Sequence, residues 1–283
     1  MSDLPATDRA PLSGLDLDEH EVSESDRRAS PPASILYEAV LREARDELSR
    51  PPSALFWSGL AAGLSIGFSF VGRSLLGAAL PEAAWTPLVT SLGYALGFLV
   101  VIIGRQQLFT ENTLTPVVSV LQRRTWASLR DMLRLWGVVL GANLVGAAVF
   151  AYLLWLDSGV FTDAQTAEFA RVGRHVVEAG VGTTFGGGIY AGWLLALLVW
   201  MLPSAERSRV VLIVVVAYAI GLGGFAHSIT GTTEAVYAVL AGEAGWGAVP
   251  AFLVPALAGN VVGGVGLVAV LNYAQAAAGS EGD

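Results

Sequence analysis

The chain has 283 residues, of which 54% are hydrophobic and only 14% are charged, whereas soluble domains carry about 25% charged residues. This composition argues against a soluble globular protein. All 16 basic residues are arginine, and 24 acidic residues outnumber them, which gives a net charge of -8. Binding of nucleic acid, which needs a basic surface, is therefore not expected. The lack of cysteine excludes disulfides, thiolate metal sites and cysteine nucleophiles.

The first 50 residues contain two different segments. Residues 1–33 are acidic, rich in Pro and Ser, and nearly devoid of aromatic side chains, without the basic start and apolar core of a signal peptide. We expect a disordered cytoplasmic tail, because this composition cannot bury enough apolar surface to fold. Residues 34–50 have helical spacing of apolar and acidic positions, from a Ser34 N-cap to Pro51. They predict an amphipathic cytoplasmic helix that lies on the membrane, packs against a bundle, or serves as a short connector.

Six runs without a charged side chain follow. They cover residues 51–72, 83–104, 135–156, 179–205, 210–233 and 244–280. Each can supply the roughly 20 residues with which a helix crosses a bilayer. Residues 51–275 are therefore predicted to be an all-α integral membrane domain of six transmembrane helices, with a C-terminal cytoplasmic tail at 276–283.

Arginine placement predicts the orientation of these spans. Arginines cluster before the first span, between the second and third, and between the fourth and fifth, and they are sparse in the opposite loops. Because cytoplasmic loops carry an excess of basic residues, we expect both termini in the cytoplasm and the protein in the cell (inner or plasma) membrane.

The second and fifth spans are predicted to be broken helices. The stretch 83–122 contains only Arg105 and Glu111 as charges, and as one helix it would be about 60 Å long, twice the bilayer core. The stretch 210–241 has three glycines in its middle, followed by a polar set that starts at His227. Irregular backbone at membrane depth occurs only where it is buried in protein or lines a cavity.

A self-comparison of the sequence reveals an internal repeat at an offset of 117 residues. The glycine-rich heptapeptide around Asn143 matches the one around Asn260, and the same offset pairs Thr110 with His227. Each half holds three spans, an odd number, so the halves must be inverted relative to each other. A 3+3 inverted repeat with interrupted helices points to a transport site near the membrane midplane.

Simpler roles for these polar residues stay open at this point. An asparagine in a glycine-rich span can hydrogen-bond a neighbouring helix, and a threonine can bond back to its own helix. His227 is the only ionisable side chain in 210–233. An ionisable group at membrane depth is a functional hypothesis by default, and a hydrogen-bonded core histidine is the alternative.

Three motifs resemble the signatures of the formate/nitrite transporter family. They are Leu108-Phe109-Thr110, Gly224-Phe225-Ala226-His227-Ser228-Ile229 and Gly259-Asn260-Val261-Val262-Gly263-Gly264. With the six spans, the resemblance covers about residues 50–275 and looks like a divergent branch of the family. It implies an aquaporin-like protomer, a homopentamer in the lipid bilayer with one pore per subunit, and passage of small monovalent anions such as formate, nitrite, hydrosulfide or lactate.

The resemblance also implies a set of pore residues. Thr110 and His227 would face each other at the centre. One apolar constriction would consist of Tyr94, Leu108 and Ile220, the other of Phe98, Phe109 and Leu195, with Arg174 attracting the anion into a vestibule and Asn143 and Asn260 as further candidates. An anion that crosses dry constrictions has a desolvation cost that the neutral acid avoids, so proton-linked passage near His227 is expected.

Several departures from the family keep other functions open. Gly231 and Gly192 stand where family members usually carry asparagine, and Ala226 replaces a larger polar residue. The alternatives are a non-conducting membrane scaffold or accessory protein, or a channel for a small neutral solute. An enzyme is not expected, since no span holds an acid–base pair, a metal cluster or a Gly-x-Ser-x-Gly elbow, and no cofactor is implied.

Two glycine stripes allow close helix contact, either inside one protomer or between subunits of a pentamer. They are Gly59, Gly63, Gly67 and Gly180, Gly188, Gly192.

Overall fold

The computed structural model describes residues 18, 33–156, 159–205, 207–269 and 271. The predicted tails at 1–33 and 276–283 therefore lie outside the described residues, apart from Asp18 and Ala33. The helices are α2 (Ala33–Ser49), α3 (Pro52–Ala79), α4 (Thr86–Ile103), α5 (Thr115–Arg123), α6 (Trp126–Trp155), α7 (Asp163–Glu178), α8 (Val181–Met201), α9 (Arg209–Leu222), α10 (Ser228–Leu240) and α11 (Ala248–Val261). Short 3-10 turns lie at Glu111–Thr113 and Leu202–Ser204, and a π-helical turn at Val262–Ala269 continues α11. The described part of the chain is thus all-helical.

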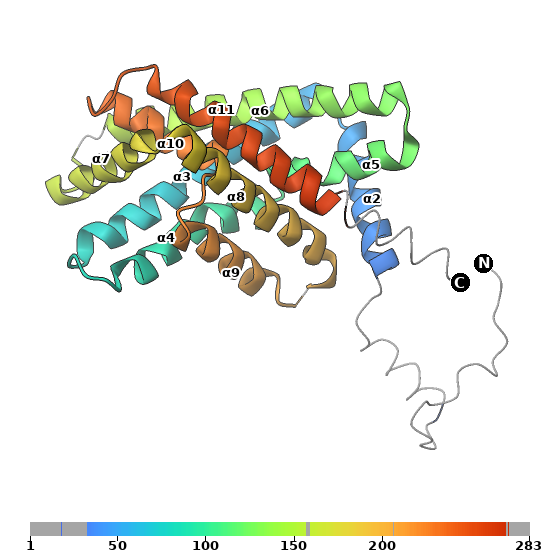
Figure 1. Ribbon diagram of the computed structural model, residues 1–283, viewed down its shortest axis with the longest axis horizontal. Coiled ribbons are helices and arrows are strands. Elements are labelled where there is room, and N and C mark those ends of the chain that lie inside the picture. Colours follow the sequence, from blue (N-terminus) through green and yellow to red (C-terminus); the bar gives the residue numbers. More distant parts are fainter. Residues whose placement is uncertain (1–17, 19–32, 157–158, 206, 270, 272–283) are drawn as a thin grey trace.

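Within the described ranges, five helices are long and apolar enough to cross a membrane. They are α3, α4, α6, the continuous segment Val181–Ser204 that begins with α8, and the segment Ala248–Gly266 that begins with α11. Where the sequence predicts the fifth of its six spans, the structure has the shorter helix α9, whose 14 residues extend only about 21 Å. It is short because the chain turns at Gly223 and resumes as α10 (Figure 1).

The long helices run side by side in one bundle, with α2 and α5 at one end and α7 at the other (Figure 1). Exposed tryptophans lie near both ends: Trp57 and Trp126 start α3 and α6, while Trp85 and Trp246 lie in the opposite loops. Such aromatic side chains are typical of the two membrane–water interfaces.

Glycine allows two pairs of helices to approach each other closely. Gly63 of α3 lies directly against the backbone of Asn143 in α6, and Gly192 of α8 lies against the backbone of Asn260 in α11, where a Cβ atom would overlap its neighbour. The stripes of α3 and α8 therefore pack within one chain, except Gly180, which has open space around it. Of the two uses that the sequence leaves open for the stripes, the structure has the contact inside the protomer.

The amphipathic helix α2 packs against the bundle. Its side chains Val40 and Leu41 are buried in a cluster with Leu114, Val118 of α5 and Val199 of α8, and Ala44 is buried as well. Arg134 Nη2 also donates to the Leu48 carbonyl oxygen at 2.6 Å. Among the positions that the sequence allows for this helix, the structure has the one on the bundle.

The breaks after α4 and α9 have the same backbone structure. Arg105 and Gly224 both adopt left-handed backbone angles, with φ of 50° and 59°. The next residue in each break donates its N–H five positions back, from Gln106 to Val101 at 3.0 Å and from Phe225 to Ile220 at 3.1 Å. These pairs are 119 residues apart.

Candidate functional site

Asn143 braces the break that follows α4. Its Oδ1 accepts the N–H of Phe109 at 2.8 Å, and its Nδ2 donates to the carbonyl oxygens of Gln107 at 2.9 Å and Gly59 at 2.7 Å. The side chain is fully buried. Its amide thus satisfies two backbone groups that the interrupted helix leaves without partners and ties them to the carbonyl of Gly59 in α3.

Asn260 does the same for the break that follows α9. Its Oδ1 accepts the N–H of Ser228 at 2.9 Å, and its Nδ2 donates to the carbonyl oxygens of Ala226 and Gly188, both at 2.9 Å. The two asparagines are 117 residues apart. The backbone groups that they bond in the breaks are 119 residues apart, since Gln107 corresponds to Ala226 and Phe109 to Ser228.

This register corrects the pairing made by the sequence comparison. The backbone equivalent of His227 is Leu108, and that of Thr110 is Ile229, because the offset is 119 at the breaks. Thr110 and His227 are therefore not equivalent positions of a repeat. They nevertheless meet in space.

The contact between Thr110 and His227 lies at the centre of the molecule. Thr110 Oγ1 and His227 Nε2 are 2.7 Å apart, and both side chains are buried. His227 is also the N-cap of α10, where its Nδ1 accepts the backbone N–H of Thr230 at 3.1 Å. A ring nitrogen that accepts an N–H carries no proton, so the imidazole is neutral and Nε2–H points to Thr110.

Apolar side chains surround this contact. The Phe98 ring lies edge-on to the His227 ring at a centroid distance of 5.1 Å, and the Tyr94 ring lies 5.5 Å from that of Phe98. The structure brings all six predicted constriction residues into one buried cluster, namely Tyr94, Phe98, Leu108, Phe109, Leu195 and Ile220. The polar pair is therefore shielded from water by hydrocarbon and aromatic groups.

One cavity reaches this centre from the end of the bundle that carries α7. This α7 cavity has a volume of about 270 Å³ and is lined by Tyr94, Ile220 and His227. Its ionisable side chains are, besides His227 and Tyr94, Arg73 from α3, His175 and Glu178 from α7, and Glu234 from α10.

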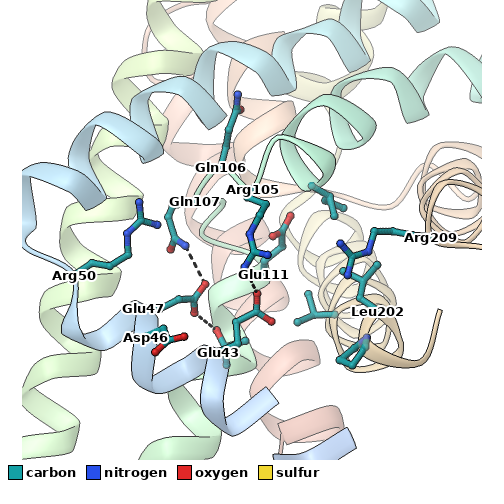
Figure 2. A pocket seen from close by; sticks show the side chains of 14 residues that line it. Glu43, Asp46, Glu47, Arg50, Arg105, Gln106, Gln107, Glu111, Leu202 and Arg209 are labelled. Carbon is teal, nitrogen blue, oxygen red and sulfur yellow. Dashed lines mark hydrogen bonds and ion pairs between the residues drawn. The ribbon is translucent and has the colours of Figure 1, made fainter. Parts of the chain in front are cut away.

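A second cavity opens at the opposite end, beside α2. This α2 cavity has a volume of about 360 Å³ and is lined by α2, the break after α4 and the residues around the α8–α9 connection. Figure 2 shows Glu43 and Glu47 pointing from α2 toward that break. Its charged side chains are Glu43, Asp46, Glu47, Glu111, Arg50, Arg105 and Arg209.

Two hydrogen bonds hold the Glu47 side chain in the wall of the α2 cavity. Its Oε1 accepts from Gln107 Nε2 at 2.9 Å, and its Oε2 accepts from Thr115 Oγ1 at 2.6 Å (Figure 2 shows the first bond). Burial raises the pKa of Glu47 above its usual 4.5, while these two hydrogen bonds act in the opposite direction. This carboxyl therefore links α2 to the residues on either side of Thr110.

Arg174, the predicted vestibule residue, has another partner. Its Nε forms an ion pair with Glu243 at 2.8 Å, on the surface between α7 and the loop after α10. Arg73 is the arginine that lines the α7 cavity. The sequence offered no signal for it beyond its position at the end of the first charge-free run.

Sequence reasoning also missed two carboxyls. Glu234 lines the α7 cavity and Glu111 the α2 cavity, and each has a buried Oε1 with no hydrogen-bond partner among the described residues. The available signal for Glu234 was its position seven residues after His227, which is the same face of a helix two turns on.

The structure gives a reason for two of the departures from the family pattern. The Phe252 ring fills the space beside Gly231 that a side chain there would need, and the Asn260 backbone does so beside Gly192. Asparagine at position 192 would therefore overlap backbone atoms, and at position 231 it would have to displace the Phe252 ring. The polar contacts of this centre must come from other residues.

Comparisons with known proteins identify the family of this chain. A model of the family described as formate/nitrite transporter matches residues 34–274. The chain is 36% identical over 244 residues to the inner membrane protein YfdC of Escherichia coli (strain K12), covering 86% of this chain and 78% of that protein. It is 28% identical over 221 residues to the formate channel FocA of the same strain, covering 71% and 74%.

Solved structures with the same fold include two channels. An FNT family ion channel matches with a TM-score of 0.74 and 21% identity over 86% of this chain and 98% of that one. A pentameric formate channel with formate bound matches with a TM-score of 0.64 and 23% identity over 79% and 97%. The chain is a membrane transport protein and belongs to the formate/nitrite transporter family.

Proposed function

We propose that this protein is a channel or transporter through which small monovalent anions such as formate, nitrite or hydrosulfide cross the inner (plasma) membrane. The observation that carries this proposal is the buried contact of 2.7 Å between Thr110 and His227. The α7 cavity reaches this contact from one end of the bundle, and the α2 cavity opens at the other. The relatives named as formate channels support the choice of anion.

The proposed architecture has six spans in two inverted halves and five chains around one axis. Matching hydrogen bonds at the two breaks support the repeat, and the solved neighbour named as a pentameric formate channel supports the pentamer. Arginine placement supports cytoplasmic termini. Native mass spectrometry should give a pentamer, and a dimer or tetramer would contradict it.

Orientation can be tested on the cysteine-free chain. Ser34 lies at the exposed start of α2, and Gly245 lies in the loop after α10 with open space around it. A cysteine at position 245 should react with an impermeant thiol reagent added to intact cells, and one at position 34 should react only after lysis. The reverse pattern would place the termini outside.

The mechanism follows from the hydrogen bonds at the centre. Since His227 Nε2–H donates to Thr110 Oγ1, the Thr110 hydroxyl hydrogen is available for a bond to the passing molecule. The surrounding rings exclude water, so a bare anion has a desolvation cost that its neutral acid avoids. Passage is therefore proton-linked, and His227 orients the hydroxyl while staying neutral.

Uptake of formate and nitrite into liposomes tests this function. Wild-type protein should transport either anion faster than protein-free liposomes, and Thr110→Val, which removes only the hydroxyl, should reduce the rate strongly. Asn112→Ala serves as a matched control, because it removes one buried side-chain bond next to Thr110 without touching the contact. Wild-type rates equal to the protein-free background would contradict the proposal.

One observation favours a second candidate function, a channel for a small neutral solute. The α2 cavity presents four carboxyl side chains beside three arginines, so its lining has no excess of arginine that would attract anions. In that case glycerol or urea should equilibrate through the wild-type protein while formate and nitrite do not.

A further inference from the structure

Glu234 and His227 share the α7 cavity. His227 is the N-cap of α10 and Glu234 lies about two turns into that helix, and both line this cavity. The Glu234 side chain is only 4% exposed. Its Oε1 is fully buried, borders this cavity and has no hydrogen-bond partner among the described residues.

A buried carboxylate without such a partner is costly unless it is paired or protonated. The charged and titratable groups that face Glu234 across the cavity are Arg73 of α3, Tyr94 of α4, His175 and Glu178 of α7, and His227. No ion pair within 4 Å links Arg73 to Glu234 in the described part of the chain. The carboxyl is thus placed to hold a proton and to face whatever enters.

His227 is poorly placed to give a proton to the cargo. Its Nδ1 accepts the Thr230 N–H at the start of α10, and its Nε2–H is directed at Thr110. A second proton on the ring would break the bond at Nδ1 and place a cation at the positive end of a helix. Proton exchange at this end of the pore therefore needs another group.

We propose that Glu234 is the proton-exchanging residue of the α7 cavity. This inference rests on the proposed function. The protonated carboxyl of Glu234 gives its proton to an oxygen of the incoming anion, which leaves as the neutral acid toward Thr110, and the Glu234 carboxylate then takes a proton from hydronium in the water of the cavity. One O–H bond breaks and one forms in each step, so charge and protons balance.

The first experiment measures formate uptake into liposomes that contain one of three proteins. In the wild type, the rate above protein-free background should rise as the α7 side is changed from neutral to mildly acidic pH. Glu234→Gln keeps the shape but has no acidic proton, so its rate should be about tenfold or more below wild type and should not change with pH. Glu178→Gln removes an exposed carboxyl at the same cavity and should keep the wild-type profile.

A wild-type pH profile in Glu234→Gln would overturn the proposal, and so would an equal loss in Glu178→Gln. Should Glu234→Gln fail to fold, Glu234→Asp keeps a titratable group at the same place and should retain a pH-dependent rate. A pH-independent rate in Glu234→Asp would then overturn it.

A second readout does not depend on transport. Infrared difference spectra of the wild type should contain a protonated-carboxyl band that formate perturbs and that Glu234→Gln lacks. If the wild type transports nothing, the proposed function fails and the transport role of Glu234 fails with it, even where this band is present and responds to formate. If the wild type transports formate and the band is absent, the role of Glu234 fails alone.

Discussion

The α2 and α7 cavities differ in how they hold their buried carboxyls. In the α2 cavity, Glu47 accepts two hydrogen bonds, and Glu43 lies 3.6 Å from Arg105. In the α7 cavity, Glu234 has a buried oxygen without such a partner. The comparison teaches that Glu47 on the α2 side is used to dock a helix, whereas Glu234 on the α7 side, like Glu111 in the α2 cavity, keeps a buried oxygen available to a ligand.

The two breaks share a backbone structure but differ in their side chains. Their backbone hydrogen bonds match, yet His227 stands in one break at the position that Leu108 occupies in the other. A repeated backbone therefore does not imply repeated chemistry. The polar contact needs Thr110 from one break and His227 from the other.

The largest effect should come from removing the asparagine braces. Asn143→Ala and Asn260→Ala each leave two buried backbone groups of a break unsatisfied, at about 1–3 kcal/mol per group. Each should lower the free energy of unfolding by about 2 kcal/mol or more, measured by thermal or denaturant unfolding in detergent. Asn112→Ala, which loses one side-chain hydrogen bond to Gln107, should lower the free energy of unfolding by less. A small loss in only one of the two asparagine variants would show that the breaks are not equivalent.

The glycine contacts should give the next largest effect. Gly63→Ala and Gly192→Ala press a methyl group against the Asn143 and Asn260 backbones, and overpacking of this kind costs about 1–3 kcal/mol. Gly141→Ala is the matched control, because nothing lies within 4 Å of its added Cβ. It should be neutral or stabilising by up to about 1 kcal/mol. Unfolding midpoints that rank these variants differently would contradict the close packing.

A smaller effect should separate the two left-handed positions. Arg105 adopts φ of 50° and Gly224 φ of 59°, and a side chain in this region costs about 1–2 kcal/mol. Arg105→Gly should therefore raise the free energy of unfolding by up to about 1 kcal/mol, since its exposed ion pair with Glu43 contributes little. Gly224→Ala should lower it by about 1 kcal/mol. A loss of stability in Arg105→Gly, or a gain in Gly224→Ala, in the same unfolding assay would contradict the equivalence of the two turns.

The smallest effect concerns the docking of α2 and its pH dependence. The pKa of Glu47 is raised in the folded protein, so its contribution to docking is fully present below its ordinary pKa of 4.5 and is lost as pH rises through the raised value. A nitroxide attached at Ser34 should become more mobile over that pH range. Glu47→Gln should remove the change, and an unchanged pH profile in this variant would assign it to another group.

The sequence predicted much of this structure, because long charge-free runs and clustered glycines report directly on membrane spans and breaks. It placed the breaks near Arg105 and Gly224 and predicted that Thr110 meets His227. It misjudged the repeat register, because the first half has two more residues between its break and its asparagine than the second half. A self-comparison at one fixed offset cannot align both the breaks and the asparagines.

The site was less predictable at its ionisable groups. Glu234 ends a charge-free run, and such a residue reads as the edge of the membrane. Only the fold shows that α10 starts inside the bundle, so that its seventh residue lies in a cavity. Arg174 was chosen because the resemblance implies a basic residue in the vestibule and only Arg171 or Arg174 was available there, but such a charge can be paired with a neighbour such as Glu243.

The asparagine braces have a consequence for how the protein is made. All three partners of Asn143 precede it within the first half, and all three partners of Asn260 precede it within the second. A ribosome that has completed either half has therefore already supplied every group needed to secure its break. The Thr110–His227 contact and the core that both halves share must wait for the whole chain. Two separately translated fragments, divided near α7, should each arrive in the membrane with the backbone of its break secured.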